Sequence, residues 1–161
     1  MADWAITDAD RRFMKMACDL ASENIDCGGG PFGTVIVRAG EVIAAAGSSV
    51  TLDKDPTAHA TVNAIRLACG VTRDFRLEGC VVYCSCEPCS MCRSALYWAG
   101  VSRVYYGNAA ADAERINLGG NDIYKEIGKP CLERSIPCIH IEGTTAIDSF
   151  DKWIAKTKIE Y

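Results

Sequence analysis

The chain has 161 residues and a mass of 17.4 kDa, the size of one domain of about 100–200 residues, which excludes a second catalytic domain. Apolar residues make up 49% and charged residues 24%, which excludes a disordered or fibrous chain. The net charge is −4, the pI is near 5.2, and no run of Lys or Arg exceeds two residues, so we expect no nucleic-acid partner.

Membrane insertion and export are not expected either. No apolar stretch of the sequence reaches the roughly 18–20 residues that a membrane span needs. The first residues, 1–4, carry no basic segment followed by an apolar one. The sequence therefore predicts a soluble, cytoplasmic single domain over residues 1–161.

A helix, a β-hairpin and a second helix are predicted in the first half of the chain. Thr7 followed by Asp10 is typical of a helix N-terminus, and apolar residues then recur on one face. The dipeptide Ala39-Gly40 separates two apolar runs, which indicates a hairpin. The predicted elements are a helix over 8–25, strands over 34–38 and 41–45, and a helix over 58–69 that Gly70 ends.

A strand–helix–strand unit is predicted next. Pro88 suits the first position of a helix, and Gly100 suits its end. A strand, a helix and a second strand in this order indicate a parallel crossover. The predicted elements are a strand over 80–84, a helix over 88–99, a strand over 103–106, a helix over 109–116, a turn over 123–127, a strand over 138–141 and a helix over 146–157.

Ten cysteines are unusual for this length. Without an export signal, and in a chain long enough to bury its own core, disulfides are not expected. Most of the thiols are predicted to be reduced and buried, where they act as small hydrophobes. The ten are Cys18, Cys27, Cys69, Cys80, Cys84, Cys86, Cys89, Cys92, Cys131 and Cys138.

Three residues predict a zinc site. His59 begins one predicted helix, and Cys89 and Cys92 begin another, in a Pro-Cys-x-x-Cys motif. Two thiolates three residues apart on a first turn point the same way, the helix dipole favours their ionised form, and an imidazole supplies a third ligand. Taken singly, the histidine could be a core residue and the cysteines a redox pair. Their combination favours Zn²⁺ with an open, catalytic fourth position, unless Cys84 or Cys86 closes the site.

These motifs resemble those of the cytidine-deaminase-fold zinc aminohydrolases, whose signature is His-Ala-Glu followed by Pro-Cys-x-x-Cys. The resemblance covers almost the whole chain and is greatest to the guanine deaminase branch. It is carried by residues 30–33 (Gly-Pro-Phe-Gly), 55–60 (Asp-Pro-Thr-Ala-His-Ala), 85–92 (Ser-Cys-Glu-Pro-Cys-Ser-Met-Cys), 97–99 (Tyr-Trp-Ala), 123–127 (Ile-Tyr-Lys-Glu-Ile) and 160–161 (Glu-Tyr).

The resemblance implies an α/β fold, a three-layer α/β/α arrangement with a five-stranded mixed sheet. It implies that water activated by zinc displaces an amino group of a small flat heterocycle as ammonia. Phe32 would stack on the ring, with a plain core residue as the alternative, and Ser48 and Ala58 would line the pocket. It also implies a homodimer with an exchanged C-terminal segment, in which Tyr161 closes the pocket of the neighbouring subunit.

The sequence departs from the pattern of this branch in three places, one of which is a pair of residues. Thr61 stands where the family has the glutamate that moves protons, and a hydroxyl group cannot replace a carboxylate whose pKa lies within reach of neutrality. Loss of such a group typically lowers the rate by about 10²–10⁴. Ser48 stands at the position of a pocket asparagine, and Gly119-Gly120 at that of an acidic pair that recognises the amino edge of guanine.

Two acidic residues are considered as substitutes. Glu126 matches an acidic residue near the pocket mouth and could take over both proton transfers; the alternative is a solvated glutamate paired with Lys125 or Lys129. Glu87, next to Pro88, is expected to brace the ligand loop.

The sequence therefore favours a zinc-dependent hydrolytic deaminase of an amino-substituted purine, pterin or triazine, with a divergent pocket. The alternative is a catalytically inactive homologue, natural or engineered, that binds zinc and a ligand without turnover. A tRNA-editing deaminase is disfavoured by the acidic charge and by the C-terminal segment.

Overall fold

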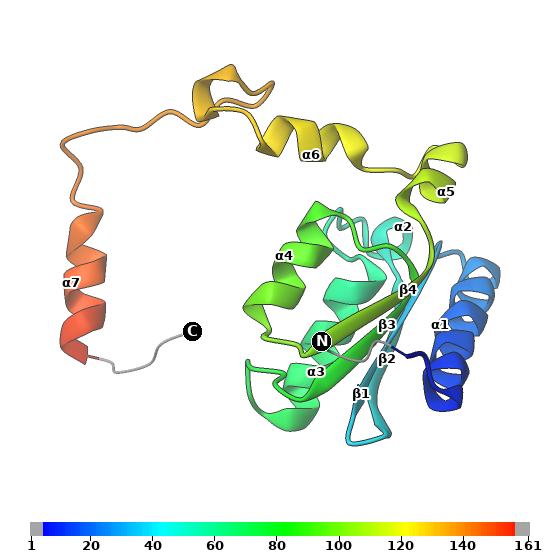
Figure 1. The fold of residues 1–161 in the computed structure, drawn as a ribbon. Helices are drawn as coiled ribbons and strands as arrows, with labels where there is room; N and C mark the ends of the chain where they lie inside the picture. The colour runs from blue at the N-terminus through cyan, green and yellow to red at the C-terminus, as the bar shows by residue number, and fades with distance from the viewer. Residues whose placement is uncertain (1–4, 157–161) are drawn as a thin grey trace. The chain divides into compact units, whose positions relative to one another are not determined.

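The computed structural model describes residues 5–156, which divide into two compact units between Asn121 and Asp122 (Figure 1). The first helix, α1, spans Asp8–Asp26, and the last helix, α7, spans Ile147–Lys156. Among these residues, no helix has the length and apolar character that a membrane crossing requires.

The first unit contains a mixed sheet with the strand order β2-β1-β3-β4. The central strand β1 pairs antiparallel with both β2 and β3, whereas β3 and β4 are parallel, which confirms the predicted crossover. The predicted hairpin is confirmed by β1 and β2, which the turn at Ala39 and Gly40 joins. The strands are β1 (Gly30–Arg38), β2 (Glu41–Ser48), β3 (Cys80–Cys86) and β4 (Arg103–Asn108).

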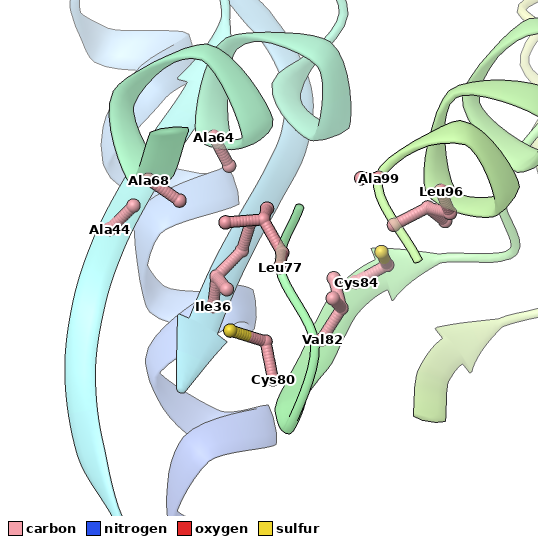
Figure 2. Packing of buried hydrophobic residues seen from close by; sticks show 10 residues of the cluster. All are labelled: Ile36, Ala44, Ala64, Ala68, Leu77, Cys80, Val82, Cys84, Leu96 and Ala99. Atoms are coloured by element: carbon pink, nitrogen blue, oxygen red, sulfur yellow. The ribbon is translucent and has the colours of Figure 1, made fainter. Parts of the chain in front are cut away.

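Helices cover both faces of this sheet, as the three-layer prediction required. Because side chains alternate along a strand, Val35 and Val37 of β1 face α1, where they pack with Phe13 and Ala17. Ile36, between them, faces the opposite layer, which contains α3 (Ala60–Thr72) and α4 (Ser90–Trp98). Figure 2 shows this second core, formed by Ile36, Ala44, Ala64, Ala68, Leu77, Cys80, Val82, Cys84, Leu96 and Ala99.

The prediction of five strands is wrong, because the sheet has four. Among residues 5–156 no strand pairs with the segment 138–141, and Ile139 and Ile141 are 72% and 73% exposed. A strand needs a neighbour for its backbone hydrogen bonds. Apolar β-branched residues alone do not supply that neighbour.

Several helix boundaries differ from those predicted. Gly70 lies inside α3, which continues to Thr72 and ends at Arg73 in the left-handed conformation. A short helix, α2 (Val50–Asp53), was not predicted. The later elements are α5 (Ala110–Arg115), α6 (Asn121–Ile127), the 3-10 turn η1 (Cys131–Glu133) and α7.

All ten cysteines are free, as predicted, but most are not buried. Only Cys80, Cys84 and Cys92 are buried, and Cys18, Cys27, Cys131 and Cys138 are exposed. Cys18 is exposed because it follows Ala17, which faces the sheet, and consecutive residues of a helix point about 100° apart.

Candidate metal centre

The predicted zinc ligands occupy the beginnings of two helices. His59 is the N-cap of α3, Cys89 is the N-cap of α4, and Cys92 lies in the first turn of α4. Both helices therefore begin slightly later than predicted, and Pro88 precedes the cap instead of opening the helix. The extended backbone at His59 and Cys89 turns both side chains out of their helices, toward each other.

The spacing of these side chains fits zinc. His59 Nδ1 lies 3.6 Å from Cys89 Sγ and 3.6 Å from Cys92 Sγ, and the three ligand atoms lie within 4.8 Å of one another. Tetrahedral zinc with ordinary Zn–N and Zn–S bonds holds its nitrogen and sulfur ligands about 3.6 Å apart. Among residues 5–156, neither Cys84 nor Cys86 joins this cluster, so the residues fit a zinc ion with one position left for a ligand.

The three ligand side chains shift one another's pKa values. A hydrogen bond from Cys92 lowers the pKa of Cys89, and the same contact raises the pKa of Cys92. Contact with Cys89 also raises the pKa of His59. Before metal binding, Cys89 is therefore favoured as the thiolate and Cys92 as the protonated thiol. A metal ion that displaces the protons finds its ligands already in place.

The loop before His59 is fixed by the half-buried amide of Asn63. Asn63 Nδ2 donates to the carbonyl groups of Gly47 (3.1 Å) and Ala58 (3.3 Å) and to Ser49 Oγ (2.9 Å). The Ser49 N–H also donates to the Ala58 carbonyl, at 3.0 Å. These bonds tie the end of β2 to the histidine ligand.

Three predicted substrate-binding residues, Phe32, Ser48 and Ala58, lie near the beginning of β1 and the end of β2. Ala58 is 2% exposed, and Ser48, 4% exposed, pairs with Gly30 across β1 and β2. Asn24 of α1 donates to the carbonyls of Gly30 (2.7 Å) and Ser48 (2.9 Å). Phe32 is half-buried, in the register irregularity between Gly30 and Gly33, a feature that commonly redirects a side chain.

Glu87 braces the cysteine loop, which confirms its predicted role. Its carboxylate accepts from Arg93 of α4 at 2.9 Å and from the N–H of Ala110, the first residue of α5, at 3.1 Å. The N–H of Glu87 donates to the carbonyl of Asn108 at 2.8 Å. The loop that carries Cys89 is thus attached to β4 and α5.

Thr61 is buried between α3 and the sheet. It is 5% exposed, and its hydroxyl oxygen lies 3.1 Å from that of Thr34 and 3.6 Å from Cys84 Sγ. Thr34 and Cys84 face each other across the β1–β3 pair, and the Thr34 hydroxyl donates to Cys84 Sγ at 3.7 Å. The Thr61 hydroxyl is therefore part of a buried three-membered hydrogen-bonded cluster.

The two remaining predicted site residues lie in the C-terminal part of the chain. Glu126, in the second unit, forms an ion pair with Lys129 and accepts from the N–H of Ser135 at 2.7 Å. These contacts lower the pKa of Glu126 to about 2. Lys125 instead pairs with Asp122, and Tyr161 lies outside the described residues.

Sequence reasoning did not identify the polar residues that support this centre. They are Asn24, Asn63 and Thr34, which belong to no motif and whose partners lie in other elements of the fold. A sequence signal exists only for Asn63, which follows His59 by one helical turn.

Comparisons with known proteins agree with this geometry. Residues 7–108 match the cytidine and deoxycytidylate deaminase zinc-binding region. The chain is 46% identical to the guanine deaminase of Bacillus subtilis over 142 residues, which cover 88% of this chain and 91% of that protein. It is 42% identical over 94 residues to a tRNA-specific adenosine deaminase of Aquifex aeolicus, covering 58% and 62% of the two chains.

A solved structure extends the similarity to the fold. The X-ray structure of guanine deaminase from Bacillus subtilis matches with a TM-score of 0.90 and 41% identity, over 97% of this chain and 99% of that one. The shared fold, the matched zinc-binding region and the His59, Cys89 and Cys92 cluster assign Zn²⁺ to this protein. The chain belongs to the cytidine and deoxycytidylate deaminase family and is a guanine-deaminase-like member of it.

Proposed function

We propose that this protein is a zinc-dependent hydrolytic deaminase of a small amino-substituted heteroaromatic base, with a pocket that departs from that of guanine deaminases. The observation that carries the proposal is the cluster of His59, Cys89 and Cys92, which fits zinc and, within residues 5–156, has no fourth protein ligand. Zinc bound in such an open site lowers the pKa of water to about 7 and so supplies a nucleophile at neutral pH.

The residues around the centre would hold the ring. Phe32 is proposed to stack on it, Ser48 to hydrogen-bond its edge, and Ala58 to form a wall beside His59. We further propose that Tyr161 closes the pocket of a second subunit in a cytoplasmic homodimer, and that the whole chain acts as one catalytic domain.

Proton transfer is the step at which this chain differs most from the family pattern. Thr61 stands at the position of the proton-moving glutamate, but its hydroxyl is hydrogen-bonded to Thr34 and Cys84 and does not ionise near neutral pH. Glu126 remains the proposed substitute, and the contacts with Lys129 and Ser135 that lower its pKa make it a weaker base than an ordinary glutamate.

The cluster around Thr61 also favours a second candidate, an inactive homologue that binds zinc and a ligand without turnover. The side chains of Thr61, Thr34 and Cys84 hydrogen-bond one another, and the Thr61 hydroxyl also contacts the Cys92 thiol. All of these partners belong to the protein itself. Such an arrangement stabilises the fold whether or not the pocket catalyses a reaction.

Ammonia release separates these two candidates. The zinc-loaded protein is incubated with a panel of aminopurines, aminopterins and aminotriazines, and ammonia is measured together with bound zinc. Release from at least one ring supports the deaminase. Stoichiometric zinc with no release from any ring favours the inactive homologue.

The variant Thr61→Glu tests how far the pocket has changed, with Thr72→Glu, near the far end of α3, as the control. A large gain in guanine deamination by Thr61→Glu alone identifies a pocket that lacks only its carboxylate. No gain, with zinc retained, identifies a remodelled pocket.

A further inference from the structure

The loop between α6 and α7 brings two cysteines together. Cys131 begins the 3-10 turn η1, and Cys138 follows seven residues later. The N–H of Cys138 donates to the carbonyl of Cys131 at 3.2 Å. Both side chains are exposed, and both thiols are free. The two cysteines therefore lie where the chain enters and leaves a short closed loop, residues 131–138.

The backbone hydrogen bond limits the distance between the two residues. With ordinary bond lengths, an N–H to carbonyl distance of 3.2 Å keeps the Cα atoms of Cys131 and Cys138 at most about 7 Å apart. Disulfides join cysteines whose Cα atoms are usually about 4.4–6.8 Å apart. The two thiols can therefore be joined with little movement of the backbone.

Further hydrogen bonds hold the loop in its closed form. The guanidinium of Arg134 donates to the carbonyls of Lys129 (2.9 Å) and Ile127 (3.0 Å). The N–H of Ser135 donates to the carboxylate of Glu126 at 2.7 Å. The loop is thus tied to the end of α6 without a covalent link. Such an ordered loop holds its two thiols at a high effective concentration.

Two other exposed cysteines have a similar spacing in the sequence but a different geometry. Cys18 lies on α1, and Cys27, nine residues later, is the C-cap of that helix. Since a helix rises about 1.5 Å per residue, these two residues lie about 13 Å apart, which is too far for a disulfide. In an unfolded chain, by contrast, loops of seven and nine residues close with almost equal ease. Only the folded structure distinguishes the two pairs.

We infer that Cys131 and Cys138, held together by this ordered loop, are a reversible redox pair, which a small-molecule disulfide oxidises to a disulfide that locks the loop between α6 and α7. One cysteine thiolate attacks a sulfur of the oxidant, which forms a mixed disulfide and releases one thiol. The other cysteine thiolate attacks the first cysteine and releases the second thiol. Two electrons pass to the oxidant, and the two cysteine protons end on the released thiols.

The pair is expected to be labile, because an exposed disulfide is more readily reduced than a structural one and is typical of regulatory sites. The competing explanation is that the hydrogen bonds of Arg134 and Ser135 alone close the loop, and that the two thiols are ordinary surface groups.

Glutathione buffers distinguish these explanations. The zinc-loaded full chain is equilibrated with oxidised and reduced glutathione, remaining thiols are blocked with N-ethylmaleimide, and both possible disulfides are quantified by mass spectrometry after digestion. In the folded chain, the disulfide between Cys131 and Cys138 should exceed that between Cys18 and Cys27 at least about ten-fold. In concentrated urea, the two should agree within a factor of about two. Excess reduced glutathione should restore the free thiols.

Two arginine variants test the contribution of the loop. Arg134→Ala removes the two hydrogen bonds that tie the loop to α6, so the ratio of the two disulfides in the folded chain should fall several-fold. Arg115→Ala, on α5, is the matched control and should keep the wild-type ratio. A ratio near one in the folded wild type, equal ratios in the two variants, or a disulfide that reduced glutathione does not reverse overturns the inference. Each of these results leaves the proposed function intact, because ammonia release tests that function separately.

Discussion

The metal ligands occupy positions that usually stabilise helices. N-caps are commonly Ser, Thr, Asp or Asn, whose side chains bond a free backbone N–H. His59 and Cys89 are N-caps with no such side-chain bond. Their ring nitrogen and sulfur are therefore free to bind zinc, and α3 and α4 lack the stabilisation of about 1 kcal/mol that an ordinary cap supplies.

Zinc should compensate for these absent caps, which gives a prediction about Cys92. In the wild type the free energy of unfolding should rise by about 1.4 kcal/mol for each tenfold increase in free zinc above Kd. Cys92→Ala should remove both the bound zinc and this dependence, because two ligands remain of three. Cys86→Ser, outside the cluster, should retain both. Elemental analysis and thermal unfolding at several zinc concentrations measure the two effects; zinc retained by Cys92→Ala would contradict the assigned ligand set.

At the scale of the elements, the position of α1 on the sheet depends on close packing against β1. A Cβ atom at Gly33 would lie 2.3 Å from the carbonyl oxygen of Ala17 and 2.8 Å from the backbone nitrogen of Ala21. The backbones of helix and strand thus approach as closely as a glycine permits. Because β1 also carries Phe32 and Thr34, this packing fixes the position of the strand that holds both residues.

Two glycine substitutions should have opposite effects. Gly33→Ala should destabilise the fold by about 1–3 kcal/mol, because backbone atoms cannot move aside as a flexible side chain can. Gly70→Ala should stabilise it by about 0.5–1 kcal/mol, because Gly70 lies inside α3 with no atom within 4 Å of an added Cβ. Denaturant unfolding of the two variants compares them directly, and equal effects would argue against the close α1–β1 contact.

The Asp10 carboxylate, at the beginning of α1, should make the free energy of unfolding depend on pH. Hydrogen bonds that the Asp10 carboxylate accepts from Thr7 and Tyr83 lower the pKa of Asp10 below its ordinary value. A carboxylate with a lowered folded-state pKa stabilises the fold above its unfolded pKa of about 3.9, and this contribution is lost as the pH falls through the folded value. Asp10→Asn should therefore be less stable than the wild type at pH 7, and the difference should shrink below pH 4. Chemical unfolding across this range tests it, with Asp26→Asn at the other end of α1 as the control.

At the scale of the molecule, the second unit leaves many apolar side chains exposed. Phe150 and Ile154 lie one turn apart on α7 and are 68% and 75% exposed. A contiguous exposed apolar face in a globular protein is typical of an interaction surface. This supports the proposed homodimer with an exchanged C-terminal segment.

Sedimentation of the full chain should therefore give twice the mass of 17.4 kDa. Ile154→Glu should shift the equilibrium toward the single chain, because a charge on the apolar face of α7 must be desolvated in the interface. Lys152→Glu, on the same helix, changes a residue that is already charged and should have a smaller effect. A wild-type chain that sediments as a monomer at all concentrations would contradict the proposed dimer.

The sequence by itself determined the features that depend on neighbouring residues. The α1 capping box, the β1–β2 hairpin and the paired thiols of Cys89 and Cys92 are local patterns, and the structure contains each of them. The zinc ligands were recognisable because three residues with strong metal chemistry began two predicted helices. The family followed from the same motifs.

Only the tertiary structure decided what depends on distant partners. The segment 138–141 has the composition of a strand, but pairing with another strand decides whether a strand forms, and the described chain supplies none. Thr61 joins Thr34 and Cys84 because the register of β1 and β3 brings those two residues together. Glu114 reaches the space above Gly119 because α5 and the following turn fold back on each other. Such contacts arise from packing, and packing is not encoded in any local pattern of residues.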